Sequence, residues 1–116
     1  MKSSASTLRS VTRHHDWVDE RSRALHAAIA DKIRHHPELL EIPKANLARW
    51  MKDASEAVQP ALQTWKTMIE TWPLEQLLEF LTQEGERADE LRQSSPFSGI
   101  LTPTERNKIF ARYEAL

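Results

Sequence analysis

The sequence predicts an all-α fold: a compact, single-domain bundle of five to six short helices with a flexible N-terminal arm. Three observations lead to this fold class. The 116 residues include only two glycines and no Asn-Gly or Asp-Gly turn, which argues against β-hairpins. Apolar residues recur at the three- and four-residue spacing of a helix face. Prolines separate these periodic segments, as expected for short helices joined by turns.

Residues 1–15, MKSSASTLRSVTRHH, form the predicted arm. This stretch is rich in serine, threonine and basic residues and has little apolar surface to bury, so we expect a flexible basic segment. Residues 16–116 then make up the helical domain. Trp17 lies at the boundary, where it either packs under the first helix or stays exposed to contact a partner. The large apolar area of tryptophan favours packing.

The first helix is predicted over residues 16–35. Its apolar face consists of Val18, Leu25, Ile29 and Ile33. Pro37 disfavours helical backbone at the residue before it, so the helix should end there. A short turn is expected over residues 38–42. Pro43 suits the first position of a second helix, which should continue to about residue 53.

Two further helices are predicted on either side of Pro73. The helix before it has the clearest core pattern in the chain, made of Leu62, Trp65, Met68, Ile69 and Trp72. Leucines at positions 74, 77, 78 and 81 repeat the pattern after the proline. Phe80 falls outside this leucine stripe, so we expect it to be an exposed aromatic residue beside an acidic face and a candidate contact residue.

The C-terminal part of the chain has clear boundary signals. Gly85 is expected to break the chain or cap a helix, and residues 86–93 predict a short helix. Thr102-Pro103-Thr104-Glu105 has the spacing of a capping box, in which the Thr102 side chain and the Glu105 side chain each accept a hydrogen bond from the other's backbone amide. A last helix should follow, with Ile109, Phe110 and Tyr113 on its inner face.

The composition excludes several classes of protein. The chain has no cysteine, which rules out disulfides, thiolate zinc sites and thiol catalysis and fits a cytoplasmic location. No apolar run approaches the roughly 18 residues of a membrane span, and the N-terminus lacks the apolar region of a secretory signal. The net charge of −1 gives no overall reason to expect nucleic-acid binding.

The charges are unevenly distributed along the chain. Residues 1–36 contain seven Lys/Arg and four Asp/Glu, a net of +3, whereas residues 70–90 contain seven acids and only Arg87 as a base, a net of −6. Such asymmetry can mark a docking surface for a charged partner, and it can equally reflect solvated helix faces.

No motif for catalysis or metal binding is present. Side chains of adjacent residues on a helix point about 100° apart, so the His14-His15 and His35-His36 pairs cannot chelate an ion from one helix face. Ser94 and Ser95 lack the context of an activated nucleophile and are better explained as polar groups in a turn. We therefore expect a non-enzymatic protein without a metal or cofactor.

The most informative stretch is LRQSSPFSGIL, residues 91–101. One interpretation is a structural connector, in which Phe97, Ile100 and Leu101 fill the bundle and Gly99 supplies a turn conformation. The other is a partner-binding loop, with Phe97 and Ile100 as apolar contacts and Arg92 as a donor to a carboxylate or phosphate.

Four blocks of the sequence resemble a group of small all-helical bacterial proteins that share these blocks in the same order. They are RSRALHAAIADKI, NLARW, PLEQLLEFL and LRQSSPFSGILTPTER, and together they fall within residues 20–110. The LRQSSPF block is the most specific. Proteins of this group are often the small partner in two-gene toxin–antitoxin modules, so the resemblance implies an antitoxin-like role.

The favoured expectation is a non-enzymatic antitoxin that neutralises a cognate toxin enzyme by direct binding. The predicted partner-binding residues are Glu75, Glu79, Phe80, Arg92, Gln93, Ser94, Ser95, Phe97, Ile100 and Leu101. The alternative is a DNA-binding regulator that uses the basic arm and first helix. Its predicted phosphate contacts are Arg9, Arg13, Arg21, Arg23 and Arg34. The sequence leaves the oligomeric state open.

Overall fold

The computed structural model describes the backbone of residues 2–114 and the side chains of residues 17–114. Within this part of the chain there are six α-helices, one short 3-10 helix and no strand, which confirms the all-α fold class. The helices are α1 (Lys2–His35), η1 (Pro37–Leu40), α2 (Glu41–Asp53), α3 (Gln59–Thr71), α4 (Leu74–Leu81), α5 (Glu86–Arg92) and α6 (Pro103–Glu114).

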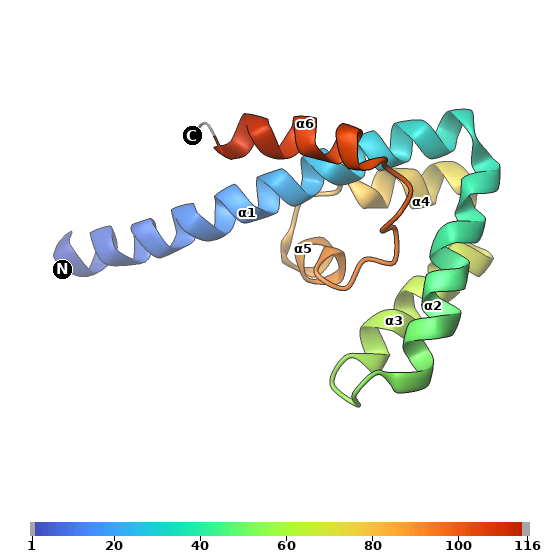
Figure 1. Cartoon of the computed structure of the whole chain (residues 1–116). Helices are drawn as coiled ribbons and strands as arrows, with labels where there is room; N and C mark the ends of the chain where they lie inside the picture. Colours follow the sequence, from blue (N-terminus) through green and yellow to red (C-terminus); the bar gives the residue numbers. More distant parts are fainter. Residues whose placement is uncertain (1, 115–116) are drawn as a thin grey trace.

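The long helix α1 is the element against which much of the domain packs. α6 lies along one side of it and α4 along another, while α2 and α3 form an antiparallel pair at its C-terminal end (Figure 1). The short helix α5 and the irregular chain after it lie between α1 and the α2–α3 pair.

The first helix is longer than the sequence predicts, because it begins at Lys2. The segment predicted as an arm forms its first turns, which extend beyond the other helices in Figure 1. The flexibility of residues 1–15 stays a prediction, and their side chains lie outside the described residues. Trp17, at the boundary, is half-buried: its indole Nε1 donates to the backbone carbonyl of Tyr113, 3.2 Å away, and its ring packs edge-on against the Tyr113 ring.

The other helix boundaries lie close to those predicted. Helix α2 begins at Glu41, so Pro43 occupies its third position rather than its first. That position tolerates proline equally well, because the amides of the first helical turn have no partner inside the helix. Gly85 precedes α5 with a positive φ of 123°, a conformation that glycine adopts without strain.

The hydrophobic core combines residues from all the major helices. The largest fully buried side chains among the described residues include Trp65, Phe97, Ile33, Leu77, Leu78 and Leu81. Phe80 also belongs to this core, with only 9% of its surface exposed. Its ring lies edge-on to Trp65 and Trp72, at centroid distances of 5.8 and 5.7 Å. The prediction of an exposed Phe80 is therefore wrong, because α4 is covered on more than one side and buries a wider stripe than its leucines.

The uneven charge distribution is partly neutralised within the chain. Arg23 of α1 pairs with Glu84 at 2.8 Å, and Arg34 of α1 pairs with Glu75 of α4 at 3.3 Å. Each of these pairs joins the basic N-terminal region to the acidic 70–90 region. Because both carboxylates are exposed, each pair contributes little to the stability of the fold.

The capping box at the start of α6 is confirmed. The Thr102 amide donates to the Glu105 carboxylate at 2.7 Å, and the Glu105 amide donates to the Thr102 hydroxyl oxygen at 3.1 Å. Lys32 of α1 donates to the same carboxylate at 2.8 Å and to the Ile100 carbonyl at 2.9 Å. The hydrogen bond from Lys32, with that from the Thr102 amide, lowers the pKa of Glu105 to about 2. The Glu105 side chain therefore stays ionised and fastens α6 to α1.

Replacing Thr102 by alanine should lower the free energy of unfolding by about 1 kcal/mol, because the substitution leaves a helix N-terminal amide without its acceptor. Urea denaturation checks this. Thr104→Ala, one helical position inside α6 and also exposed, is the matched control and should change stability by less than half as much. Equal effects of the two substitutions would mean that the capping box does not stabilise α6.

Candidate functional site: the 91–101 segment

The LRQSSPFSGIL sequence, here called the 91–101 segment, continues the last turn of α5 and then leaves the helix. The amides of Gln93, Ser94 and Ser95 each donate to the carbonyl three residues earlier, at 3.1, 3.0 and 3.2 Å. Pro96 has no amide to continue the pattern, so the chain turns away. Gly99 has a positive φ of 97°, which a residue with a side chain would adopt only with strain.

Helix α2 holds the turn through a buried asparagine. The Asn46 side-chain amide donates to the Pro96 carbonyl at 2.8 Å and to the Ser98 carbonyl at 2.9 Å. Its side-chain oxygen accepts from the Arg49 guanidinium at 2.7 Å. The Asn46 amide nitrogen therefore fixes the turn, since it joins two carbonyls that no helix partner would satisfy.

Helix α3 holds the beginning of the segment through Trp65. The Trp65 indole donates at 2.8 Å to the Leu91 carbonyl, a buried acceptor at the end of α5 that also accepts from the Ser94 amide. The same ring lies edge-on to Phe97, with a centroid distance of 5.5 Å. Phe97 is only 1% exposed.

Arg92 carries a charge into the interior, where 4% of its surface is exposed. Its Nη1 donates to the Leu81 carbonyl at the end of α4, and its Nη2 donates to the Asp89 carboxylate. Its Nε is the buried side-chain polar atom that has no hydrogen-bond partner among the described residues. The guanidinium thus acts mainly inside the chain, and its Nε is left without a partner.

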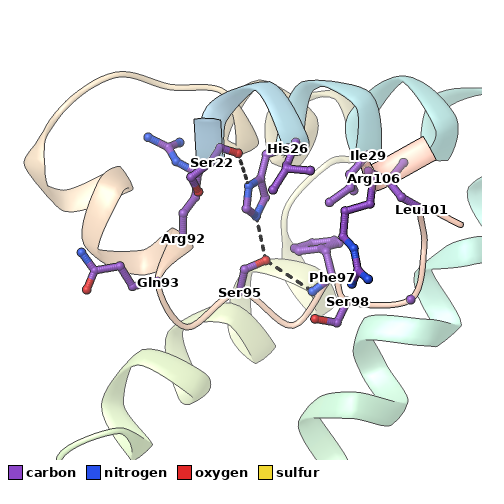
Figure 2. Close-up of a pocket in the computed structure, with 12 residues that line it drawn as sticks. Ser22, His26, Ile29, Arg92, Gln93, Ser95, Phe97, Ser98, Leu101 and Arg106 are labelled. Atoms are coloured by element: carbon purple, nitrogen blue, oxygen red, sulfur yellow. Dashed lines mark hydrogen bonds between the residues drawn. The ribbon is translucent and has the colours of Figure 1, made fainter. Parts of the chain in front are cut away.

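Helix α1 holds the segment through His26, which is 5% exposed. The Nδ1 atom lies 2.7 Å from the Ser22 carbonyl, which can only accept, so this nitrogen carries the proton. Nε2 is then the acceptor for the Ser95 hydroxyl, 2.8 Å away, and the Phe97 amide donates to the Ser95 oxygen at 3.3 Å (Figure 2). This chain of hydrogen bonds joins α1 to the centre of the 91–101 segment.

The pKa of His26 is lowered to about 4, chiefly by burial and further by the positive charge of Arg92, although the hydrogen bond to the Ser22 carbonyl opposes the shift. His26 is therefore neutral at physiological pH. The Ser95 hydroxyl and the His26 ring have the geometry of a serine–histidine dyad, in which the Ser22 carbonyl holds the ring. A histidine with this pKa is, however, a weak proton acceptor. The lowered pKa of His26 therefore favours a structural role for these hydrogen bonds over activation of Ser95 as a nucleophile.

Two hollows flank the 91–101 segment and share Gln93, Ser95 and Ser98. The first, here called the His26 hollow, has a volume of about 290 Å³. The second, here called the Val58 hollow, measures about 680 Å³ and lies towards α2 and α3. Its lining includes Trp50, Leu62 and Val58; the last is a large apolar residue with 39% of its surface exposed.

The structure places the predicted partner-binding residues in three groups. Phe80, Arg92, Phe97 and Ile100 are buried, so the expected apolar contacts of the 91–101 segment lie in the core instead of on the surface. Phe97 and Ile100 point inward because the irregular segment closes one side of the bundle. Ser94, Ser95 and Leu101 are half-buried, and Glu75, Glu79 and Gln93 are exposed.

Several residues of the site escaped the sequence-based prediction. They are His26, Asn46, Arg49, Val58, Ser98 and Arg106. Two of them had a usable signal: His26 lies three residues before Ile29 on the apolar face of α1, and Asn46 lies beside Leu47 on that of α2. A polar residue in such a position is expected to have a specific hydrogen-bond partner.

Three of the five arginines predicted to bind DNA have partners within the chain. Arg23 and Arg34 are in the ion pairs described above. Arg21 lies between two aromatic rings, with its guanidinium carbon 5.0 Å from the Trp17 ring centroid and 4.9 Å from that of Phe110. The side chains of Arg9 and Arg13 lie outside the described residues.

Among the described residues, no group of three or more histidine and carboxylate side chains is placed to hold a metal ion. In the same part of the chain, no helix combines the length and apolar character needed to cross a membrane.

No protein-family model, curated protein or solved structure matches this chain.

Stability should depend on pH through His26. Because its pKa is about 4 in the folded state and near 6.5 in the unfolded chain, the unfolded state binds more protons between these values. The free energy of unfolding should be highest above pH 6.5 and fall by about 3 kcal/mol as the pH drops to 4. Urea denaturation at several pH values checks this. His26→Gln should remove that part of the pH dependence, and His35→Gln, an exposed change on the same helix, should keep it. Identical profiles for both variants would contradict the assignment.

Asn46→Ala should lower the free energy of unfolding by about 2–3 kcal/mol, because it leaves the Pro96 and Ser98 carbonyls without their donor. It should also speed amide hydrogen exchange in the 91–101 segment. Asn107→Ala, an exposed change on α6, should do neither. The role of Asn46 would be disproved by unchanged exchange of the segment in the Asn46 variant.

Proposed function

We propose that this chain is a non-enzymatic protein-binding module of the bacterial cytoplasm, and that it serves as the antitoxin of a two-gene toxin–antitoxin module. The resemblance of its four sequence blocks to antitoxin-like proteins motivates the second part of the proposal. The observation that supports the first part is the way in which the 91–101 segment is held.

An irregular surface segment binds tightly when its conformation is fixed before the partner arrives, because little conformational entropy is then lost on association. His26, Asn46 and Trp65, from three different helices, hold the backbone and side chains of this segment. The exposed Gln93 and Ser98 are consequently presented on a rigid support. Such an arrangement suits recognition of a folded protein surface.

The Val58 hollow provides an apolar contact next to this rigid segment. Val58 and the half-buried Trp50 lie beside the polar groups of Ser94 and Ser98. An apolar centre bordered by polar groups is the usual composition of a protein–protein contact. We therefore place the main partner contact on the face formed by the Val58 hollow and the exposed edge of the 91–101 segment.

The acidic 70–90 region would act on the partner at longer range. Glu79 is exposed, and it remains available to attract a basic toxin surface, whereas Glu75 already pairs with Arg34. Complementary charge chiefly raises the rate of association. DNA binding, the alternative function, is the weaker proposal because Arg21, Arg23 and Arg34 have partners within the chain.

The decisive experiment is co-expression of this chain with the product of the adjacent gene. We expect a stoichiometric complex on gel filtration and rescue of growth when the adjacent product alone is toxic. If the two proteins do not associate and the purified chain instead shifts duplex DNA at about 50 mM salt, with binding lost steeply at higher salt, the regulator function replaces this proposal.

Val58→Glu should weaken the complex at least tenfold, because it places a charge at the apolar centre of the proposed contact. Isothermal titration calorimetry measures this directly. Ala57→Glu, also exposed and adjacent in the chain but outside the lining of the Val58 hollow, is the matched control and should bind within threefold of the unmodified protein. Equal losses in the two variants would place the contact elsewhere.

A further inference from the structure

A further hollow lies between α2 and α3 and is here called the α2–α3 groove. It has a volume of about 360 Å³, and all of its lining residues belong to these two helices. It shares no lining residue with the Val58 hollow, which uses other faces of the same helices. The α2–α3 pair extends away from α1 in Figure 1, so the groove belongs to a part of the fold that projects from the long helix.

The floor of the groove is apolar. Leu47 of α2 and Ile69 of α3 form it, with 2% and 8% of their surfaces exposed. The half-buried Met51 and the exposed Ala48 add apolar surface along α2. A groove of this kind between two helices accepts the side-chain ridge of another helix, which is the usual way in which helices pack.

The rim of the groove carries unpaired charges of both signs. Lys66 and Glu70 lie one turn apart on α3, and both are exposed. Neither has an ion-pair partner among the described residues, although their spacing would allow them to pair with each other. Lys44, on the α2 rim, already pairs with Glu41 at 3.1 Å. The α3 rim therefore offers one base and one acid to another molecule.

This combination of charges is self-complementary. A two-fold symmetric contact brings the same surface of two copies together, so each residue meets its counterpart's neighbour. When the axis passes between positions 66 and 70, the two α3 helices run antiparallel, and Lys66 of each copy faces Glu70 of the other. Both charges of each rim are then paired. A partner surface of one sign would pair with only one of them.

We propose that the α2–α3 groove is the contact between two copies of this chain, in which the two α2–α3 pairs form a four-helix bundle and Lys66 of each copy pairs with Glu70 of the other. Helical pairs with an apolar face commonly assemble in this way. The dimer goes beyond the proposed antitoxin function and does not depend on it, because the Val58 hollow uses other faces of the helices.

The size of the surface sets the expected affinity. α2 and α3 have 13 residues each, which makes each helix about 20 Å long. A contact of this length and two helices wide is at the small end of specific protein interfaces, so we expect a dissociation constant on the order of 10–100 µM.

Sedimentation equilibrium of the full chain over a range of concentrations measures this dissociation constant. Ala48→Glu should raise it at least tenfold, because the substitution places a charge in the apolar part of the groove. Ala45→Glu is the matched control, since Ala45 is also exposed on α2 but lies outside the lining of the groove. It should leave the dissociation constant within about threefold of that of the unmodified chain.

Charge reversal tests the symmetry of the contact. Lys66→Glu and Glu70→Lys, each alone, should weaken the dimer about tenfold, because each places like charges opposite one another at two symmetric positions. The double variant, with both changes, restores opposite charges at these positions and should dimerise as the unmodified chain does. General destabilisation of α3 would not produce this recovery.

A chain that stays monomeric at about 1 mM, well above the expected dissociation constant, would overturn the proposal. So would a dimer that Ala48→Glu does not weaken, or a double variant no stronger than the single variants. If Ala48→Glu weakens the complex with the adjacent gene product while the chain alone is monomeric, the groove binds that product instead of a second copy. Val58→Glu tests the antitoxin contact separately.

Discussion

The fold depends on hydrogen bonds that fasten one irregular segment to the helices around it. Residues 91–101 satisfy only some of their own backbone groups, because the segment leaves the helix at Pro96 and forms no strand. Asn46 of α2 donates to the Pro96 and Ser98 carbonyls, and Trp65 of α3 donates to the Leu91 carbonyl, while His26 of α1 bonds the Ser95 hydroxyl. Since an unpaired buried polar group costs more than a typical hydrogen bond contributes, these contacts also exclude other packings of the helices.

This fastening explains why polar and apolar residues of the segment have such different positions. Phe97 and Ile100 enter the core formed by Trp65 and the helices, while Gln93 and Ser98 remain outside. Arg92 is buried with them, and its charge near His26 helps to keep that histidine neutral. A single turn therefore sets the core packing, the electrostatics of the site and the shape of the two hollows.

Ion pairs on the surface of the bundle also connect segments that are distant in the sequence. The basic α1 and the acidic region that includes α4 pair through Arg34–Glu75 and Arg23–Glu84. Lys32 connects α1 to both the end of the 91–101 segment and the start of α6. Exposed pairs of this kind stabilise little individually. Their main effect is to reduce the charge that remains for a partner.

The sequence by itself determined the helical class, most helix boundaries and the capping box, because these follow from spacing, proline and local hydrogen bonding. It did not reveal that Phe80 is buried, since burial depends on how many neighbours cover α4. Nor did it reveal that His26, Asn46 and Arg106 surround the 91–101 segment, because they are distant in the chain and only packing brings them together. The tertiary structure alone decided which residues form the candidate site, since a site of this kind is a property of the contacts between helices.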